Sequence, residues 1–504
     1  MNKENNIFLR AKFLDIKTGH PWIIVIHEED AKRNGIYPGN KIILKWGKKQ
    51  TEVTVDLSKE LIKEGEVGLF KDIIEKYPIQ EGEIIELFLA PPPSSLEAIR
   101  KKLKGGRLNY EEILSIISDV VNYHLDDVQI AFFIASAFME KNFSLEEIYY
   151  LTKAIAETGQ KIYWDNKIIA DKHSIGGLPN NRTTPLVVSI NASLNILIPK
   201  TSSRAVTSSC GTADVIESIA QVEFDLETIK KIVKKTNGCL VWGGSLKLAP
   251  ADDRLLKVSY ELGIEPFSKM IVSIMAKKVA MGTTHLVIDL PFKKGTKISN
   301  YTEALKIKDT FIKIGQKFNI KTEVLIEEIK YPIVGNGVGP LLEIIDVLKI
   351  LEQKENRSLY LEERALKLAG LLLEIIGKAP KGKGIKLAKK QLENGEAFHK
   401  FQEIIECQNG KKYITLKDLQ LKNISFDFKA EKSGYLKEIN PLKINRLVRL
   451  LGAPNIKEAG ILFIKKIGEK VIEGETIFTL FSNSQQRINL ALQKIKEDQP
   501  FEIV

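Results

Sequence analysis

The sequence predicts a multidomain α/β fold with four parts: a β-rich N-terminal module, a helical domain, an α/β domain on a largely parallel sheet, and a small α+β C-terminal module. The chain has 504 residues, more than a single hydrophobic core usually supports. The period of its hydrophobic residues changes several times along the chain. The run Pro91-Pro92-Pro93 can continue neither a sheet nor a helix interior, so it marks a domain boundary.

Residues 1–90 are expected to form the β-rich module, because short runs of β-branched and aromatic residues alternate with turn residues. A short helix is expected at Glu28–Asn34. The expected strands are Ile7–Asp15, Trp22–His27, Lys41–Trp46, Gln50–Asp56 and Glu83–Ala90.

Residues 96–165 are expected to form the helical domain, because apolar residues recur there at helical spacing. Ser144 and Glu147 form a capping-box pattern, which predicts the start of its last helix. The expected helices are Leu96–Leu103, Tyr110–Tyr123, Asp126–Lys141 and Leu145–Thr158.

Residues 166–420 alternate short apolar strands with helices, which is typical of a parallel sheet covered by helices. The helices within 250–282 are expected to pack on the helical domain. The expected strands are Ile168–Ala170, Ile196–Ile198, Cys239–Trp242, His285–Leu290 and Thr322–Ile326. The helices expected between and after them include Leu226–Lys235, Lys269–Ala280 and Asn300–Phe318. Residues 424–504 change pattern again and are expected to form the small α+β module.

The net charge of +11 is compatible with a nucleic-acid-binding protein or with an enzyme that acts on small anionic molecules. The lysines are spread along the chain without a dense basic arm, which favours the enzyme. Cys210, Cys239 and Cys407 are too far apart for a disulfide framework or a zinc site. The N-terminal residues carry no apolar core of a signal peptide, and no apolar run is long enough to span a membrane. We therefore expect a cytoplasmic protein.

The densest polar segment is Asp171–Gly177, which we expect to follow the strand Ile168–Ala170 directly. Glycines let backbone N–H groups approach phosphate oxygens, and Lys172 and Ser174 add further donors. An ordinary strand–helix turn is the alternative. The P-loop pattern is absent from this segment. The isolated His173 is expected to orient the loop or touch the substrate, and no metal site is expected.

A second polar segment, Lys200–Thr212, contains six hydroxyl side chains before its Gly-Thr pair, together with Lys200 and Arg204. Hydroxyls donate to phosphate oxygens, and arginine can bind them with two hydrogen bonds. A segment rich in serine and threonine is often an ordinary surface loop without a binding role. Ligands of parallel sheets nevertheless bind at the carboxyl ends of strands, where this segment and the first would meet.

Two more segments carry candidate polar groups. Gly243-Gly244 follows another predicted strand and leads to Asp252-Asp253, whose carboxylates could simply cap a helix. Ser273 and Lys277 stand four residues apart in an apolar helix, so they share one face.

Taken together in this order, the motifs resemble the thymidine phosphorylase/AMP phosphorylase family over nearly the whole chain. A module like residues 1–90 is found in AMP phosphorylases and not in the shorter pyrimidine nucleoside phosphorylases, so the chain resembles the long branch. The motifs are DKHSIGG at 171–177, NRTTPLVV at 181–188, KTSSRAVTS at 200–208, GTAD at 211–214, VWGG at 241–244, SIMAKK at 273–278 and GVGPLLEIIDVL at 337–348.

The resemblance implies an α/β domain that holds phosphate, a barrel-sandwich-like C-terminal module and a homo-oligomer, a homodimer or larger. It also implies roles for individual residues. Glu265 stands, before Pro266, where the family has an aspartate proton donor. The phosphate- or nucleotide-binding positions are Lys172, Ser174, Gly177, Ser202, Ser203, Arg204, Ala205, Val206, Thr207, Ser208, Thr212, Ser273, Lys277 and Lys297.

This reading predicts phosphorolysis of an N-glycosidic bond, with AMP as first substrate and thymidine as the alternative. Inorganic phosphate is a substrate, and no metal or organic cofactor is expected. A phosphoribosyltransferase is a further enzyme hypothesis, in which Asp252-Asp253 would bind magnesium. A non-catalytic nucleotide- or RNA-binding protein is the hypothesis from a different class.

Overall fold

The computed structural model describes residues 6–136, 143–205, 208–263, 266–293, 296–421 and 424–504. The chain divides into two compact units. Unit 1 comprises residues 1–142 and 254–264, and unit 2 comprises residues 143–253 and 265–504.

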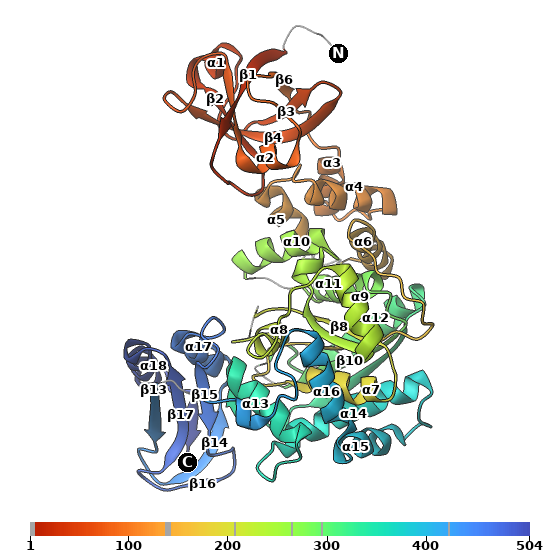
Figure 1. The fold of residues 1–504 in the computed structure, drawn as a ribbon, viewed down its shortest axis with the longest axis vertical. Coiled ribbons are helices and arrows are strands. Elements are labelled where there is room, and N and C mark those ends of the chain that lie inside the picture. The colour runs from red at the N-terminus through yellow and green to blue at the C-terminus, as the bar shows by residue number, and fades with distance from the viewer. Residues whose placement is uncertain (1–5, 137–142, 206–207, 264–265, 294–295, 422–423) are drawn as a thin grey trace. The chain divides into compact units, whose positions relative to one another are not determined.

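The N-terminal part of unit 1 is a closed six-stranded barrel with strand order β1-β5-β2-β4-β3-β6 (Figure 1). Closure leaves no strand edge free to pair with another chain. Strand β5 was missed from sequence because Gly68 interrupts its apolar run; a side chain there would lie 2.7 Å from Leu14 Cδ1. The elements are β1 Ile7–Leu14, β2 Ile23–His27, α1 Glu28–Arg33, β3 Lys41–Trp46, β4 Lys49–Ser58, β5 Glu66–Phe70, α2 Lys71–Lys76 and β6 Ile84–Leu89.

The rest of unit 1 is helical. It contains α3 Ser95–Leu103, α4 Tyr110–Val121, α5 Asp127–Ala135 and most of α10 Pro250–Glu261. The predicted helix Asp126–Lys141 is described only to residue 136. Arg254 of α10 donates to Val120 O at 2.8 Å and Leu125 O at 2.9 Å, so it holds the turn that follows α4.

Unit 2 is built on parallel strands in the orders β11-β10-β7 and β8-β9, joined by a parallel bridge between Ile169 and Leu197. This confirms the predicted parallel α/β core. Its strands are β7 Ala170–Ser174, β8 Ile198–Ser202, β9 Gly238–Trp242, β10 His285–Phe292 and β11 Lys321–Glu328.

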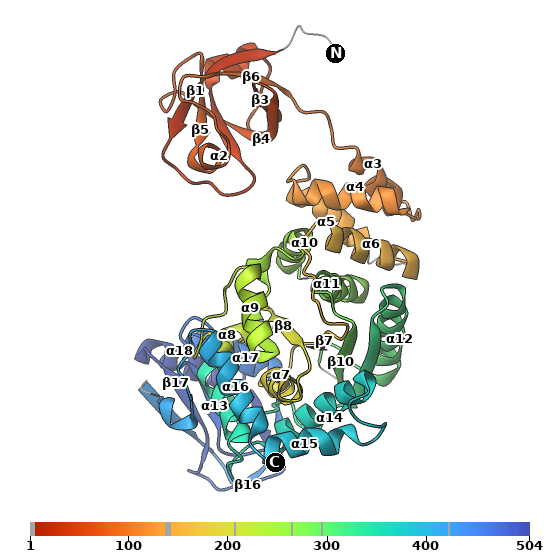
Figure 2. The ribbon, with the colours of Figure 1, turned by 45° about the vertical axis from the view of Figure 1, so that its right-hand side comes forward.

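Helices cover these strands, with α12 and α14 packed on β10 and β11 (Figure 2). Helix α7 is buried on nearly all sides, as expected of a helix without a polar face. The helices are α6 Leu145–Glu157, α7 Thr183–Ser193, α8 Thr212–Ile216, α9 Leu226–Thr236, α11 Phe267–Ala280, α12 Tyr301–Lys317, α13 Pro340–Leu351, α14 Leu359–Ile376, α15 Gly384–Glu393 and α16 Glu396–Cys407. The predicted capping box of Ser144 and Glu147 is present at the start of α6, against which α11 packs.

The C-terminal part of unit 2 has two small sheets, β12-β15-β17-β13 and β16-β14-β18. Strand β12 comes from the α/β part of the chain and pairs with β15, so it joins this module to that part. The elements are β12 Gly337–Val338, β13 Ile424–Lys429, β14 Gly434–Ile439, α17 Pro441–Leu451, β15 Gly460–Phe463, β16 Lys470–Val471, β17 Thr476–Ser482, α18 Gln485–Glu497 and β18 Phe501–Ile503. Within the described ranges, no helix is both long and apolar enough to cross a membrane.

Candidate anion and nucleotide site

The first two polar segments begin on strands, not after them. The predicted strand Ile168–Ala170 ends too early: β7 runs to Ser174, so Lys172 is a strand residue. In the same way β8 runs to Ser202, beyond the predicted Ile196–Ile198. The predicted strands are defined by runs of apolar residues. The ends of β7 and β8 were missed because their buried residues are polar and interact with each other.

Lys172 is a fully buried cation held by hydroxyl groups. Its ammonium donates to Ser174 Oγ, to Thr183 Oγ1 at 2.6 Å and to Thr184 Oγ1 at 3.3 Å. Within the described chain no carboxylate forms an ion pair with it. Burial lowers the pKa of Lys172 to about 8 against the attraction of Asp289. A buried cation without its own carboxylate is the environment that an anionic ligand would complete.

The carboxylate of Asp289, which attracts the Lys172 ammonium, is hydrogen-bonded to other partners. Asp289 of β10 accepts from Ser174 Oγ at 2.7 Å and from Arg364 at 2.8 Å. Asn181 also donates to it, at 3.0 Å. Arg364, from α14, further binds Glu327. Asp289 therefore orients the Ser174 hydroxyl, while Arg364 neutralises most of its charge.

Three more lysines surround His173. Asp171 pairs with Lys278 at 2.6 Å and lies 3.6 Å from Lys200, so one buried carboxylate serves two buried ammonium groups. Burial lowers the pKa of Lys200 to about 7. Burial, followed by Lys278, Lys200, Lys172 and Lys277, lowers the pKa of His173 well below its usual value. His173 thus lies among several lysines, of which Lys278 and Lys277 are paired with Asp171 and Asp252.

The Gly-Gly turn after β7 leaves open space. Gly177 has φ +108°, a backbone conformation that other residues rarely adopt. A side chain built at Gly176 or Gly177 would meet no atom within 4 Å. The hydroxyl of Ser202, at the end of β8, is buried without a hydrogen-bond partner. This arrangement leaves room and an unused donor for a ligand.

The segment after β8 folds around the carboxylate of Asp214. The backbone N–H groups of Ala205 and Gly211 both donate to Asp214 Oδ2 at 2.7 Å. Ser203 O accepts from Ala213 N at 3.3 Å. Gly211 is required here, because a Cβ would lie 2.3 Å from Ser203 O. Asp214 therefore closes the loop that carries half of the fourteen candidate binding positions.

Arg182, to which the sequence assigned no role, connects the segments that follow β7 and β8. Its guanidinium donates to Thr212 Oγ1 and to Cys210 O, both at 2.8 Å. Its Nε binds Glu343 of α13, a buried carboxylate. Cys210 Sγ donates to the same carboxylate at 3.0 Å. Arg182 thus joins the segments that follow the two strands, while the contact of Asp171 with Lys200 at 3.6 Å brings the two predicted polar segments themselves together.

Arg204 is engaged by carboxylates in this structure. It pairs with Glu217 at 2.6 Å, Glu223 at 2.8 Å and Asp214 at 3.3 Å. Its guanidinium also lies 4.8 Å from the ring centroid of Trp242. Hydrogen bonds from Arg204 and Lys457 lower the pKa of Glu217 to about 2. Arg204 can bind an anion only by exchanging some of these partners.

The C-terminal module holds the same loop from outside. Arg449 of α17 donates to Ser208 O at 2.7 Å, and Ser209 N donates to Asn445 Oδ1 at 3.1 Å. The Ser208 hydroxyl itself donates to Cys210 O at 2.8 Å. Two domains therefore fix the loop's position.

Ser273 and Lys277 lie on one face of α11 and meet one carboxylate. Ser273 Oγ donates to Asp252 Oδ2 at 2.6 Å, and Lys277 Nζ lies 2.9 Å from the same oxygen. Burial, opposed by Lys277 and aided by Asp252, raises the pKa of Asp253 to about 6. Asp252 and Asp253 thus belong to a charged cluster with Ser273 and Lys277, the residues expected to bind the nucleotide base. They are not merely a helix cap.

Three candidate residues, Glu265, Val206 and Thr207, lie outside the described residues. Lys297 is half-buried in the segment that follows β10. Sequence reasoning missed Thr183, Thr184, Asp289 and Arg364, the groups that position Lys172 and Ser174. The only sequence signal among these was the pair Thr183 and Thr184 in the motif at 181–188.

Family models match most of the chain. The helical bundle domain of a glycosyl transferase family matches residues 96–159, and its a/b domain matches residues 166–398. The pyrimidine nucleoside phosphorylase C-terminal domain matches residues 435–502.

Solved structures show the same core fold. Anthranilate phosphoribosyltransferase from Thermus thermophilus superposes with a TM-score of 0.53 at 16% identity, covering 62% of this chain and 99% of that one. The enzyme from Saccharomyces cerevisiae gives a TM-score of 0.50 at 14% identity, covering 63% and 98%. These likenesses concern the fold alone.

Similar proteins align over nearly the full length, including the barrel. The AMP phosphorylase of Thermococcus sibiricus is 42% identical, over 98% of this chain and 97% of that one. The AMP phosphorylase of Methanocaldococcus jannaschii is 38% identical, over 97% and 96%. The chain, with its barrel, its phosphorylase core and its C-terminal module, belongs to the AMP phosphorylase family.

Proposed function

We propose that this protein uses inorganic phosphate to cleave the N-glycosidic bond of AMP, which yields adenine and ribose 1,5-bisphosphate. The observation that carries the proposal is the buried ammonium of Lys172, bonded to three hydroxyls and, among the residues that the structure describes, to no carboxylate. Full-length similarity to AMP phosphorylases at 38–42% identity supports AMP as the substrate.

In this proposal phosphate binds among Lys172, Ser174 and the hydroxyls of Thr183 and Thr184. Cleavage builds positive charge on the sugar, and an adjacent phosphate stabilises that charge before bonding to the anomeric carbon. Holding two anions together is costly in free energy, and the lysines around His173 offset their repulsion. The loop 203–212, with Gly177, would hold the nucleotide's own phosphate.

The departing base gains negative charge and needs a proton. Glu265 is our proposed general acid, one methylene longer than the family's aspartate. Ser273, Lys277 and Lys297 would position the nucleotide beside it. The proton passes from the carboxyl to a base nitrogen as the C–N bond breaks and phosphate oxygen bonds to the anomeric carbon. The chemistry in this scheme needs no metal or organic cofactor.

Base release decides between the candidate functions. The purified protein is incubated with phosphate and a panel that includes AMP, other nucleoside monophosphates, adenosine and thymidine. We expect release of adenine from AMP that requires phosphate, and formation of ribose 1,5-bisphosphate. Thymine release from thymidine at a greater kcat/KM would favour the thymidine alternative. Salt-sensitive RNA binding without base release would favour the non-catalytic hypothesis.

We further propose a cytoplasmic homodimer or larger homo-oligomer that binds nucleotide and phosphate and not nucleic acid. The three cysteines are unpaired, and Cys210 and Cys239 are buried, which suits a reducing compartment. Light scattering of the purified protein tests the oligomeric state.

A further inference from the structure

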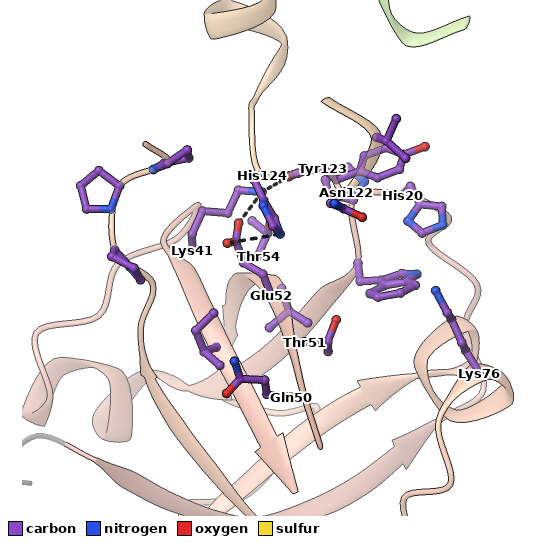
Figure 3. Close-up of a pocket in the computed structure, with 18 of the residues that line it drawn as sticks. His20, Lys41, Gln50, Thr51, Glu52, Thr54, Lys76, Asn122, Tyr123 and His124 are labelled. Carbon is purple, nitrogen blue, oxygen red and sulfur yellow. Dashed lines mark hydrogen bonds and ion pairs between the residues drawn. The ribbon is translucent and has the colours of Figure 1, made fainter. Parts of the chain in front are cut away.

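A cavity lies entirely within unit 1, between the barrel and the turn that follows α4 (Figure 3). Its volume is about 760 Å³, within the range of ~300–1,000 Å³ usual for small-molecule sites. It shares no residue with the site on the strand ends of unit 2. Its walls come from the loop His20–Trp22 before β2, strands β3 and β4, the end of α2, the linker Pro91–Pro93 and residues 121–124.

The cavity carries more positive than negative groups. Lys41, Lys76 and His124 line it, against one acidic residue, Glu52. Figure 3 shows Lys41, Glu52 and His124 gathered on one side, with Lys76 on another. Among the described residues Lys76 has no carboxylate partner; its ammonium lies 4.2 Å from the ring centroid of Trp22. An anionic ligand would therefore find an available cation here.

Glu52 and Thr54 each carry a buried oxygen that accepts no hydrogen bond, although Glu52 forms ion pairs with Lys41 and His124. Glu52 Oε1 and Thr54 Oγ1 are buried, and neither has a hydrogen-bond partner. Lys41 Nζ lies 3.7 Å from Glu52 Oε1 and instead donates to Tyr123 O at 2.8 Å. His124 Nε2 lies 3.9 Å from the other Glu52 oxygen. A buried carboxylate oxygen without a donor is costly, so a ligand hydroxyl would satisfy it.

Aromatic rings form another wall. The ring of His20 stacks on Tyr123 at 4.4 Å and lies 4.9 Å from Trp22. Trp22 in turn meets Tyr77 edge-on at 5.2 Å. Such a wall suits a flat, polar ring system.

We propose that this cavity binds a nucleoside 5′-phosphate, as a second nucleotide site of the chain. The phosphate lies between Lys41 and Lys76, the ribose hydroxyls donate to Glu52 and Thr54, and the base packs on Trp22 and Tyr77. A carboxylate that accepts from ribose hydroxyls is a common arrangement in nucleotide sites.

Counting bound nucleotide tests the proposal. Equilibrium dialysis with AMP, without inorganic phosphate, is done on the full-length protein and on the double variant Lys76→Ala/Glu52→Gln. We expect the double variant to bind one equivalent fewer per chain, and Lys76→Ala alone to weaken that equivalent about tenfold. Lys63→Ala, at an exposed barrel lysine outside the cavity, is the matched control and should bind as the unmodified protein does.

The count does not depend on the proposed function, because the lost equivalent is measured whether or not the unit 2 site binds AMP. In a Lys172→Ala protein the unit 1 site should persist, and there ribose 5-phosphate and adenosine should each bind more weakly than AMP. Equal binding by the double variant and the unmodified protein, with both folded by circular dichroism, would overturn the proposal. Adenosine binding as tightly as AMP would overturn the assigned role of Lys41 and Lys76.

Discussion

The guanidinium of Arg182 donates a 2.8 Å hydrogen bond to the hydroxyl of Thr212 and thereby joins the segments that follow β7 and β8. The side chain of Arg182 is 9% exposed and that of its partner Glu343 is 1% exposed. Such a pair is costly to break from one side, since the other charge then stays buried alone. Arg182 thus positions the loop 203–212, although Arg182 is not one of the residues predicted to bind phosphate or nucleotide.

Replacing Arg182 by Met should lower both stability and affinity for substrate anions. We expect a loss of about 3–5 kcal/mol in the free energy of unfolding, because Glu343 is left unpaired. Urea unfolding measures this loss. Thr212→Val removes one of the two hydrogen bonds by which Arg182 joins the segments and leaves the bond to Cys210 O. It should raise KM for AMP several-fold while changing stability by about 1 kcal/mol. An unchanged KM in Thr212→Val would contradict the positioning role.

Replacing Lys172 by Ala should abolish phosphate-dependent cleavage and leave the fold intact. The fold survives because Asp289 keeps Arg364 as its partner. We expect kcat/KM for phosphate to fall by about 10²–10³ or more, as when a preorganised electrostatic contact is removed. Steady-state adenine release measures the effect, and near-UV circular dichroism checks the fold. Activity equal to that of the unmodified enzyme would remove Lys172 from the site.

Phosphate use should weaken in alkaline solution. Burial lowers the pKa of Lys172 to about 8, so the free enzyme loses this positive charge as the pH rises through 8. Phosphate needs the ammonium form, and kcat/KM for phosphate should therefore be retained below pH 8 and fall up to tenfold per pH unit above it. A profile measured from pH 6 to 10 at constant ionic strength tests this. A flat profile to pH 10 would show that the Lys172 charge is not required.

Glu265→Gln should lower kcat by about 10²–10⁴, the usual contribution of a general acid. AMP binding should persist, because the amide has nearly the same shape as the carboxyl. Glu265→Asp introduces the family's residue and should keep much of the activity. Asp253→Asn is the matched control, since the pKa of the Asp253 carboxyl is raised to about 6. If Asp253→Asn loses the acid-dependent step and Glu265→Gln does not, Asp253 is the acid.

Freeing Arg204 from its carboxylates should strengthen anion binding. Glu217 and Glu223 compete with any substrate phosphate for the same guanidinium. The double variant Glu217→Gln/Glu223→Gln should therefore lower KM for AMP several-fold, with a larger effect at low salt. Arg204→Gln should raise that KM. A higher KM in the double variant would mean that the carboxylates hold Arg204 in its binding position.

The sequence predicted the parallel core, because strands and helices there follow clear hydrophobic periods. It placed β7 and β8 too early, since Lys172 and Lys200 do not look like buried strand residues. Their burial depends on partners such as Thr183 for Lys172 and Asp171 for Lys200. A single sequence shows residue types but not pairings across the sheet. Ser273 and Lys277 were predictable as a pair because both lie on one helix.

The anchoring of Ser208 and Ser209 by Arg449 and Asn445 has a consequence for biosynthesis. The ribosome releases α17 only after the whole parallel sheet has emerged. A partly made chain therefore contains every predicted anion ligand but lacks the anchors of one loop. Competence to bind nucleotide should appear late, near chain completion, and a fragment that stops at residue 420 should fold its sheet and still leave that loop unanchored.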